Sequence, residues 1–356
     1  MLEIDPHNVV EYLRDRGWLD RHVSARAEVL AWGVSNAVLR ITPESGDPFV
    51  VKQSREQLRT KDPWFSRLDR IWRETAVMRL LQPLLPGGVI PRVLFEDRQN
   101  YLFGMEAAPA AHAVWKQVLL EGRAEPAIAR RLGTYLATIH RCTALRPDLQ
   151  SQFGDTEVFV QLRVDPFYRR VAEASREAAP HVERLIAEMF SLPVCLVHAD
   201  FSPKNVLIAG ERIVLVDFET GHYGDPAFDL GFFLSHLLLK LVRHAGRFTE
   251  YAALTTAFWE TYLQGLDELS HEAPFVPSEI VRRTTGHLAG CLWARIDGTS
   301  RIDYLAEPQQ RVVREFCQSL FADPPAGWSR LLARLAAVLE SHRLSLPCTD
   351  LPVENR

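Results

Sequence analysis

The chain has 356 residues, of which 47% are hydrophobic, so it can build a sizeable core in one two-lobed body or in two or three domains. Its 41 basic and 45 acidic side chains give a formal net charge of −4, which provides no broad basic surface and argues against nucleic acid as a partner. The five cysteines are odd in number and contain no Cys-x-x-Cys pair, so neither a zinc site nor a disulfide framework is predicted.

Two strands, 28–32 and 37–41, are predicted around a turn-prone segment that contains Gly33, Ser35 and Asn36. Small residues of this kind let a backbone approach a phosphate closely with its N–H groups turned inward. An ordinary hairpin turn explains this segment equally well when it is considered alone.

A lysine ends the next predicted strand, residues 49–52. An unpaired charge in such an apolar run is costly, so we expect Lys52 to contact a phosphate and a carboxylate. Glu74 is the expected partner, because it shares one face of a predicted helix, residues 68–81, with the apolar Ile71. An edge-strand lysine and a solvated glutamate are the alternative.

A further pair of strands is predicted at residues 89–95 and 101–106. Met105 and Glu106 end this pair, and the Ala-Ala-Pro that follows suits a crossing into the next part of the chain. Later elements are a helix over 128–139, a short buried strand at 194–197 and a helix over 228–242.

Asp200 and Asn205 follow the short buried strand, and Asp217 follows another apolar run, residues 213–216. That run is predicted to be the second strand of a hairpin whose first strand is residues 206–208. Because the hairpin is short, we expect it to return Asp217 to the loop that carries Asp200 and Asn205.

These three side chains suit phosphoryl transfer from ATP. Asp200 can orient an acceptor hydroxyl, while Asn205 and Asp217 offer the oxygen ligands that Mg²⁺ needs. The order His-x-Asp-x4-Asn, then a strand ending in Asp-Phe, is that of the catalytic and metal loops of protein kinases. Turn residues and an incidental cap would explain either half alone, but less readily both halves in this order.

At residues 198–205, 217–219 and 223–231 the chain resembles the superfamily of aminoglycoside phosphotransferases and choline kinases. These are small-molecule kinases with a protein-kinase-like fold. Glu219 stands where protein kinases have glycine, and a helix-like apolar run begins already at Phe228. No room is left for an activation segment, so a protein substrate is not expected.

A second likeness is confined to the N-terminal part. Gln53, Trp64, the run 68–70 and Glu74 resemble the corresponding segment of methylthioribose kinases, which belong to the same superfamily. This likeness favours a small metabolic substrate without deciding which one.

The resemblance implies an α+β, protein-kinase-like two-lobed fold. A small β-rich nucleotide-binding lobe is expected over residues 1–106 and a larger, mainly helical catalytic and substrate lobe over 107–345. The proline-rich end, 346–356, is predicted to be a loosely ordered tail.

The resemblance also implies ATP and Mg²⁺ as cofactors. Lys52, steadied by Glu74, would position the α- and β-phosphates. The remaining residues expected at the nucleotide are Gly33, Ser35, Asn36, Met105 and Glu106.

Roles in the catalytic loop follow from the same resemblance. Asp200 is the expected catalytic base, and Asn205 and Asp217 are the expected metal ligands. His198 is expected to organise the loop, and Asp229, at a helix start, to brace the loop backbone as structural support rather than to take part in chemistry.

Glu219 is one candidate substrate residue. Three more candidates lie near the end of a predicted helix that stops at Gly298, namely Trp293, Arg295 and Asp297. A tryptophan with an aspartate suits a cationic amine, and an arginine with an aspartate suits a sugar or an acid. A structural tryptophan and a surface ion pair explain them equally well. Arginines are mixed with the acids in this part of the chain, which favours a metabolic hydroxyl compound over a polycationic aminoglycoside.

Three alternatives stay open: an aminoglycoside antibiotic phosphotransferase, a protein kinase and a nucleotide-binding pseudokinase. A pseudokinase would usually lack one of the four residues Lys52, Asp200, Asn205 and Asp217, and all are present. The N-terminus lacks the features of a signal peptide, and the run at 228–242 is too short and polar to span a membrane, so a cytoplasmic protein without a membrane partner is expected.

Overall fold

The structure, a computed structural model, describes residues 1–30, 35–58 and 64–344. They form two compact units. The first comprises the described parts of Met1–Gln117, Cys142–Asp165 and Pro193–Gly224. The second comprises Val118–Arg141, Pro166–Leu192 and the described residues from Asp225 on. The predicted lobe boundary at residue 106 stays a prediction, and the predicted tail and Gly33 lie outside the described residues.

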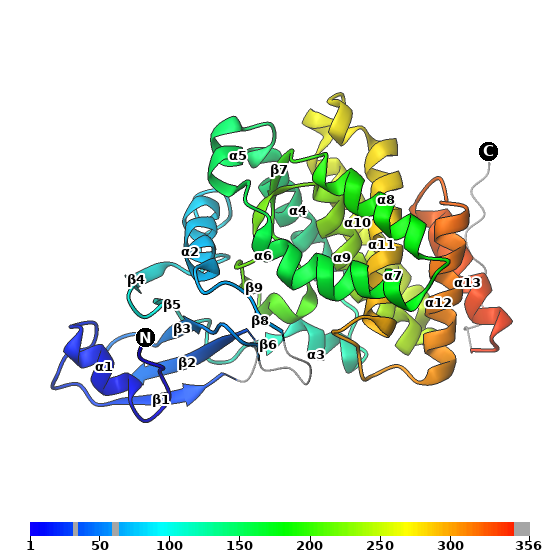
Figure 1. Cartoon of the computed structure of the whole chain (residues 1–356). Helices are drawn as coiled ribbons and strands as arrows, with labels where there is room; N and C mark the ends of the chain where they lie inside the picture. Colours follow the sequence, from blue (N-terminus) through cyan, green and yellow to red (C-terminus); the bar gives the residue numbers. More distant parts are fainter. Residues whose placement is uncertain (31–34, 59–63, 345–356) are drawn as a thin grey trace. The chain divides into compact units, whose positions relative to one another are not determined.

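The first unit contains an antiparallel five-stranded sheet with the order β1-β2-β3-β5-β4 (Figure 1). Its strands are β1 Ala25–Val29, β2 Asn36–Pro43, β3 Phe49–Ser54, β4 Val93–Asp97 and β5 Leu102–Glu106. The central strand β3 is buried along its whole length, which explains its run of apolar residues.

Two strands differ from the predicted positions. β1 begins earlier than predicted, because it is a largely exposed edge strand whose extent follows its pairing with β2, from Ala25 opposite Pro43 to Val29 opposite Leu39. The end of the predicted strand, residues 31–32, lies outside the described residues. β4 begins only after Pro91, since proline has no N–H to donate to a sheet.

Two helices accompany this sheet. α1, Val9–Asp15, contributes Val9 and Leu13 to a buried cluster with strand residues such as Leu39. α2, Arg70–Leu81, buries the face that carries Ile71 and Glu74, as predicted. A glutamate therefore lies where a core residue is expected.

The rest of the first unit carries two small antiparallel sheets and short helices. β6 Ala113–Val114, β8 Val206–Ala209 and β9 Arg212–Leu215 form one sheet, and β7 Cys195–Val197 pairs with β10 His222–Gly224 in the other. The helices are α5 Pro147–Phe153, α6 Glu157–Phe159 and a 3₁₀ turn at Pro203–Asn205. A π-helical segment, Val160–Arg169, and α3, Trp115–Leu120, each continue into the second unit.

The second unit is helical in its described residues. Its helices are α4 Pro126–Thr143, whose last residues belong to the first unit, α7 Arg170–Ala174, α8 Ala179–Phe190, α9 Pro226–Arg243, α10 Phe248–Gly265, α11 Pro277–Asp297, α12 Glu307–Ala322 and α13 Trp328–Ser341. Short 3₁₀ turns lie at Ala245–Arg247, Asp267–Leu269 and Ala273–Phe275.

Helix α9 is the core of the second unit. All its residues from Pro226 to Val242 are buried, and it packs against α10, α11 and α12. Gly231 allows the close approach of α11, since a Cβ at this position would lie 2.6 Å from the backbone nitrogen of Leu288. Because α9 is buried on all sides, its sequence is mostly apolar.

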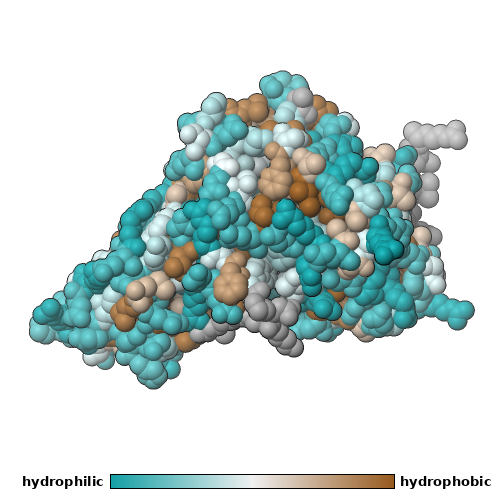
Figure 2. Space-filling model, in the orientation of Figure 1, coloured by the Kyte–Doolittle hydropathy of each residue, from teal (hydrophilic) through white to brown (hydrophobic). Residues whose placement is uncertain are grey.

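The predicted α+β class is confirmed, with an antiparallel sheet near the N-terminus and a helical remainder. Among the described helices, none has both the length and the apolar character required to cross a membrane. The surface in view is mainly hydrophilic, and its hydrophobic residues lie in small patches (Figure 2).

A buried histidine in the second unit is expected to make stability depend on pH. His287 on α11 bonds to the Tyr168 hydroxyl through Nδ1 (2.8 Å) and has Nε2 3.9 Å from Asp225, which also pairs with Arg283. Burial lowers the pKa of His287 from 6.5 to about 4, against the opposing charge of Asp225. The unfolded chain therefore binds this proton more readily, so the stability contribution is complete above pH 6.5 and is lost as pH falls towards 4.

The loss attributable to His287 is up to about 3 kcal/mol, since each pKa unit corresponds to about 1.4 kcal/mol. Urea unfolding across this pH range should show a flatter dependence for His287→Gln than for the wild type. His271→Gln, at an exposed histidine, serves as the control. A His287→Gln profile parallel to that of the wild type would contradict the assignment.

Candidate active site

The β8–β9 hairpin brings the predicted catalytic residues together within the first unit. Its strands pair from Val206 opposite Leu215, and the Val216 N–H donates to the Asn205 carbonyl (3.1 Å). As a result the ammonium of Lys204 lies 2.8 Å from Asp200 and 4.0 Å from Asp217. The predicted return of Asp217 to the loop of Asp200 is confirmed.

Two residues of this region have a left-handed backbone. Ala199, just before Asp200, has φ 58°, and Asp217 itself has φ 72°. This conformation costs roughly 1–2 kcal/mol for a residue with a Cβ and is concentrated at functional sites. The fold therefore holds both carboxylates in positions that a relaxed turn would not give them.

Asp200 is buried, and both its oxygens have partners. Arg163 Nη2 lies 2.7 Å from Oδ1, while the Asn205 amide (2.8 Å) and Lys204 Nζ (2.8 Å) contact Oδ2. Arg163 also donates from Nε to the Ala199 carbonyl (2.8 Å). The sequence contains no signal for Arg163, which comes from the π-helical segment upstream, whereas Lys204 stands inside the motif itself.

His198 contacts the catalytic loop, and its predicted organising role stays a prediction. Its Nδ1 accepts from the Asp200 N–H (3.3 Å), its carbonyl accepts from the Thr220 hydroxyl (3.1 Å), and its ring packs on Phe218. Asp229 is buried in the second unit, 3.2 Å from His140 Nε2. Its predicted role as a brace stays a prediction.

Lys52 joins two carboxylates. Its Nζ lies 2.7 Å from Glu74 and 2.7 Å from Asp217, and both Lys52 and Glu74 are buried. The predicted Lys52–Glu74 contact is confirmed, and the alternative of a solvated glutamate is wrong.

The charged groups of this cluster shift one another's pKa values. Burial disfavours the charged form of Lys52, but the negative charges of Asp217, Glu74 and Glu219 outweigh it and raise the lysine pKa. Burial raises the pKa of Glu74 to about 7 despite its contact with Lys52. For Asp217 burial acts in the same direction, yet Lys52 and Lys204 dominate and lower its pKa. Lys52 is therefore a cation and Asp217 an anion at neutral pH.

Glu219 is held by two residues of the N-terminal segment. One of its oxygens accepts from the Asn36 amide (2.7 Å) and from Arg70 Nε (3.1 Å). Arg70, fully buried, also donates to the carbonyls of Ser35 (2.6 Å) and Arg55 (2.7 Å). Sequence reasoning missed this connection, because an arginine in the first turn of a helix usually faces solvent. The predicted substrate role of Glu219 stays a prediction.

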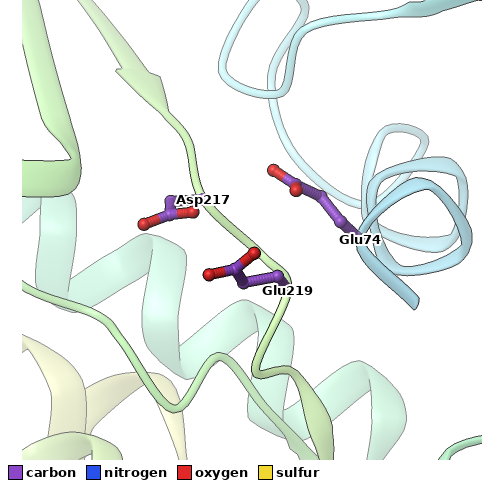
Figure 3. Close-up of side chains that lie close together, drawn as sticks. All are labelled: Glu74, Asp217 and Glu219. Carbon is purple, nitrogen blue, oxygen red and sulfur yellow. The ribbon is translucent and has the colours of Figure 1, made fainter. Parts of the chain in front are cut away.

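Three carboxylates lie close enough to share a cation. Glu74, Asp217 and Glu219 each offer an oxygen within 4.8 Å of the other two. In Figure 3 the Glu74 side chain extends from α2 towards Asp217 and Glu219, which lie on one segment after β9. Carboxylate oxygens are the donors that Mg²⁺ prefers, so the chemistry of this set fits the predicted ion.

A pocket of about 840 Å³, its open mouth included, adjoins these groups. Apolar side chains line it together with Lys52, Asn205 and Asp217. The apolar lining includes Leu30, Val38, Val50, Met105, Leu207 and Val216, and Ser35, Asn36 and Glu106 also contribute. Except for Gly33, every residue predicted at the nucleotide thus lines one pocket.

The other substrate candidates lie in the second unit. Trp293 donates from Nε1 to Asp297 (3.0 Å), and Arg295 donates to the Ser300 hydroxyl (2.7 Å). Asp297 forms a two-point pair with Arg314, with both bonds at 2.9 Å. Residues two apart on a helix do not face each other, which explains why Asp297 finds this more distant partner. A substrate role for the three candidates stays a prediction.

Comparisons with known proteins identify the family of this chain. Residues 26–271 match the family APH, described as a phosphotransferase enzyme family. Methylthioribose kinase of Pectobacterium carotovorum subsp. carotovorum is 26% identical over 265 residues, which are 66% of this chain. This chain spans 65% of the length of that relative.

Two solved structures share the fold. Amicoumacin kinase hAmiN, in complex with AMP-PNP, Ca²⁺ and Ami, has a TM-score of 0.52 and 16% identity over 92% of this chain and 97% of that one. Choline kinase from Cryptosporidium parvum Iowa II has a TM-score of 0.50 and 12% identity over 95% of this chain and 96% of that one. Since the family match covers more than half of the sequence, the chain belongs to the APH phosphotransferase enzyme family.

Proposed function

We propose that this protein is an ATP-dependent kinase that phosphorylates a hydroxyl group of a small molecule in the cytoplasm. The observation that carries the proposal is the convergence of Lys52, Asp200, Asn205 and Asp217 beside one pocket. Family membership supports the same reaction class. The net charge of −4 supports a small-molecule partner rather than nucleic acid.

The side chains that line the pocket suit both the base and the phosphates of a nucleotide. Its apolar side chains, such as Val38, Val50 and Leu207, would cover the faces of the adenine ring. The ammonium of Lys52, already held by Glu74, would contact the phosphates. The low pKa of Asp217 keeps a negative charge beside this lysine.

Asp217 and Asn205 would hold Mg²⁺, with Glu74 and Glu219 within reach of the same ion. The Asn205 amide nitrogen faces Asp200, so its oxygen is the atom it would offer to a cation. When bound, the ion would neutralise phosphate charge during transfer.

Asp200 would act on the acceptor. The acceptor oxygen bonds to the γ-phosphorus, the bond from that phosphorus to the bridging oxygen breaks, and ADP leaves. The hydroxyl proton moves to the Asp200 carboxylate, which Arg163 and Asn205 hold in place. Positioning of the hydroxyl supplies most of the rate acceleration, since phosphoryl transfer requires little covalent chemistry from the protein.

The surroundings of Asp200 favour an acceptor without several positive charges. Arg163 and Lys204 both contact this carboxylate, so a polycationic aminoglycoside would approach two cations. A sugar or another neutral alcohol meets no such repulsion. Similarity to a methylthioribose kinase places thiosugars among the compounds to test first.

ADP formation with a panel of acceptors tests the proposal. Sugars including methylthioribose, amino alcohols including choline, aminoglycosides and a protein such as casein should be compared in the presence of MgATP. We expect turnover with a small neutral alcohol, and about 10³-fold slower turnover with Asp200→Asn. Phosphorylation of the protein alone, or nucleotide binding without any turnover, would contradict the proposal in favour of a protein kinase or a pseudokinase.

A further inference from the structure

Lys204 differs from the other cations of the site in its exposure. Its side chain is 44% exposed, against 5% for Lys52 and 10% for Arg163. It stands in the 3₁₀ turn Pro203–Asn205 and lines the pocket together with Lys52 and Asp217. A lysine of this kind is a point charge on a flexible stem, so its ammonium can change partners at little cost.

The ammonium of Lys204 lies between the two carboxylates of the reaction. It is 2.8 Å from Asp200 Oδ2, on the side of the acceptor, and 4.0 Å from Asp217 Oδ2, on the side of the nucleotide. Asn205 already donates to the same oxygen of Asp200, and Arg163 holds the other. Asp200 therefore keeps two partners that fix its orientation when Lys204 moves away.

We propose that Lys204 is a further catalytic residue, whose ammonium leaves Asp200 when the nucleotide binds and contacts the phosphoryl group during its transfer. This inference rests on the proposed kinase function. The exchange has two effects. The transferred group gains a cation, and Asp200 Oδ2 loses one, which makes this oxygen a better acceptor for the hydroxyl proton.

The bonds that form and break are those of the kinase reaction, and Lys204 keeps its own proton throughout. It donates hydrogen bonds to the phosphoryl oxygens, whose share of the charge changes during transfer. A permanent ion pair between Lys204 and Asp200 would instead leave the base neutralised. The two possibilities differ in whether Lys204 recognises the transferred group.

Aluminium fluoride is an analogue of the transferring phosphoryl group. Measuring MgADP binding with and without it shows, without any acceptor, whether Lys204 contacts the transferred group or stays paired with Asp200. Calorimetry should show that fluoride tightens MgADP binding in the wild type. In Lys204→Ala we expect the tightening to fall by about 10²-fold, as for loss of one transition-state donor. Affinity for MgADP alone should stay within about threefold, because Lys52 and Asp217 remain.

Three further variants sharpen the test. Lys204→Gln keeps most of the side-chain length without the charge and should behave as Lys204→Ala, while Lys204→Arg should retain most of the tightening. Arg212→Ala removes an exposed cation from the β8–β9 hairpin that follows the turn of Lys204, and should match the wild type. Thermal melting of each variant checks that the loop still folds.

Equal tightening in wild type and Lys204→Ala would overturn the inference while leaving the kinase function intact. A parallel loss of affinity for MgADP alone would also overturn it, since Lys204 would then bind the nucleotide in general. Failure of the folded wild type to bind MgADP at all would contradict the proposed function itself, and with it this inference.

Discussion

Asp200→Asn is expected to lower kcat by about 10³-fold while MgADP affinity stays within about threefold. The amide matches the carboxylate in shape and can keep one acceptor oxygen near Arg163, but it cannot take the hydroxyl proton. Asp200 is buried, and Arg163 and Asn205 hold its carboxylate in place. Steady-state kinetics with the best acceptor of the panel, together with calorimetry of MgADP, measures both quantities.

Asp217→Asn is the matched comparison. Asp217 pairs with Lys52 and is one of three carboxylates that can share a cation, so its loss should weaken MgADP binding itself. The two variants thus separate the acceptor side of the site from the nucleotide side. Equal loss of nucleotide affinity in both would contradict this division of labour.

Arg70→Met should destabilise the first unit by about 3–5 kcal/mol, the usual effect of removing one partner from a buried ion pair. The guanidinium is fully buried and holds Glu219 together with the carbonyls of Ser35 and Arg55. Methionine matches the length of the stem but leaves Glu219 with its charge buried. Urea unfolding followed by circular dichroism gives the change in free energy.

Arg79→Met on the same helix is the control. Arg79 is largely exposed and pairs with Glu96 at the surface, so its replacement should change stability by less than about 1 kcal/mol. Similar small effects of both substitutions would show that Arg70 has no special part in the fold.

Local patterns predicted most of the architecture. β3 and the strands of the β8–β9 hairpin contain short apolar runs, and α2 has apolar residues at helical spacing, so their positions followed from the local sequence. β1 did not, because an exposed edge strand owes its extent to the partner strand rather than to its own residues. Glu74 was recognised for the opposite reason, since a charge on a buried face needs a partner.

The sequence by itself indicated the reaction class that we propose, because Asp200, Asn205 and Asp217 follow strands that a short hairpin must bring together. It also determined the Lys52–Glu74 pair, since two charges in apolar settings have few ways to be satisfied. Only the tertiary structure decided what holds these groups. Arg70 reaches Glu219, and Arg163 reaches Asp200, across long stretches of chain. Long polar side chains carry no periodic signal, and their partners are set by the packing of distant segments.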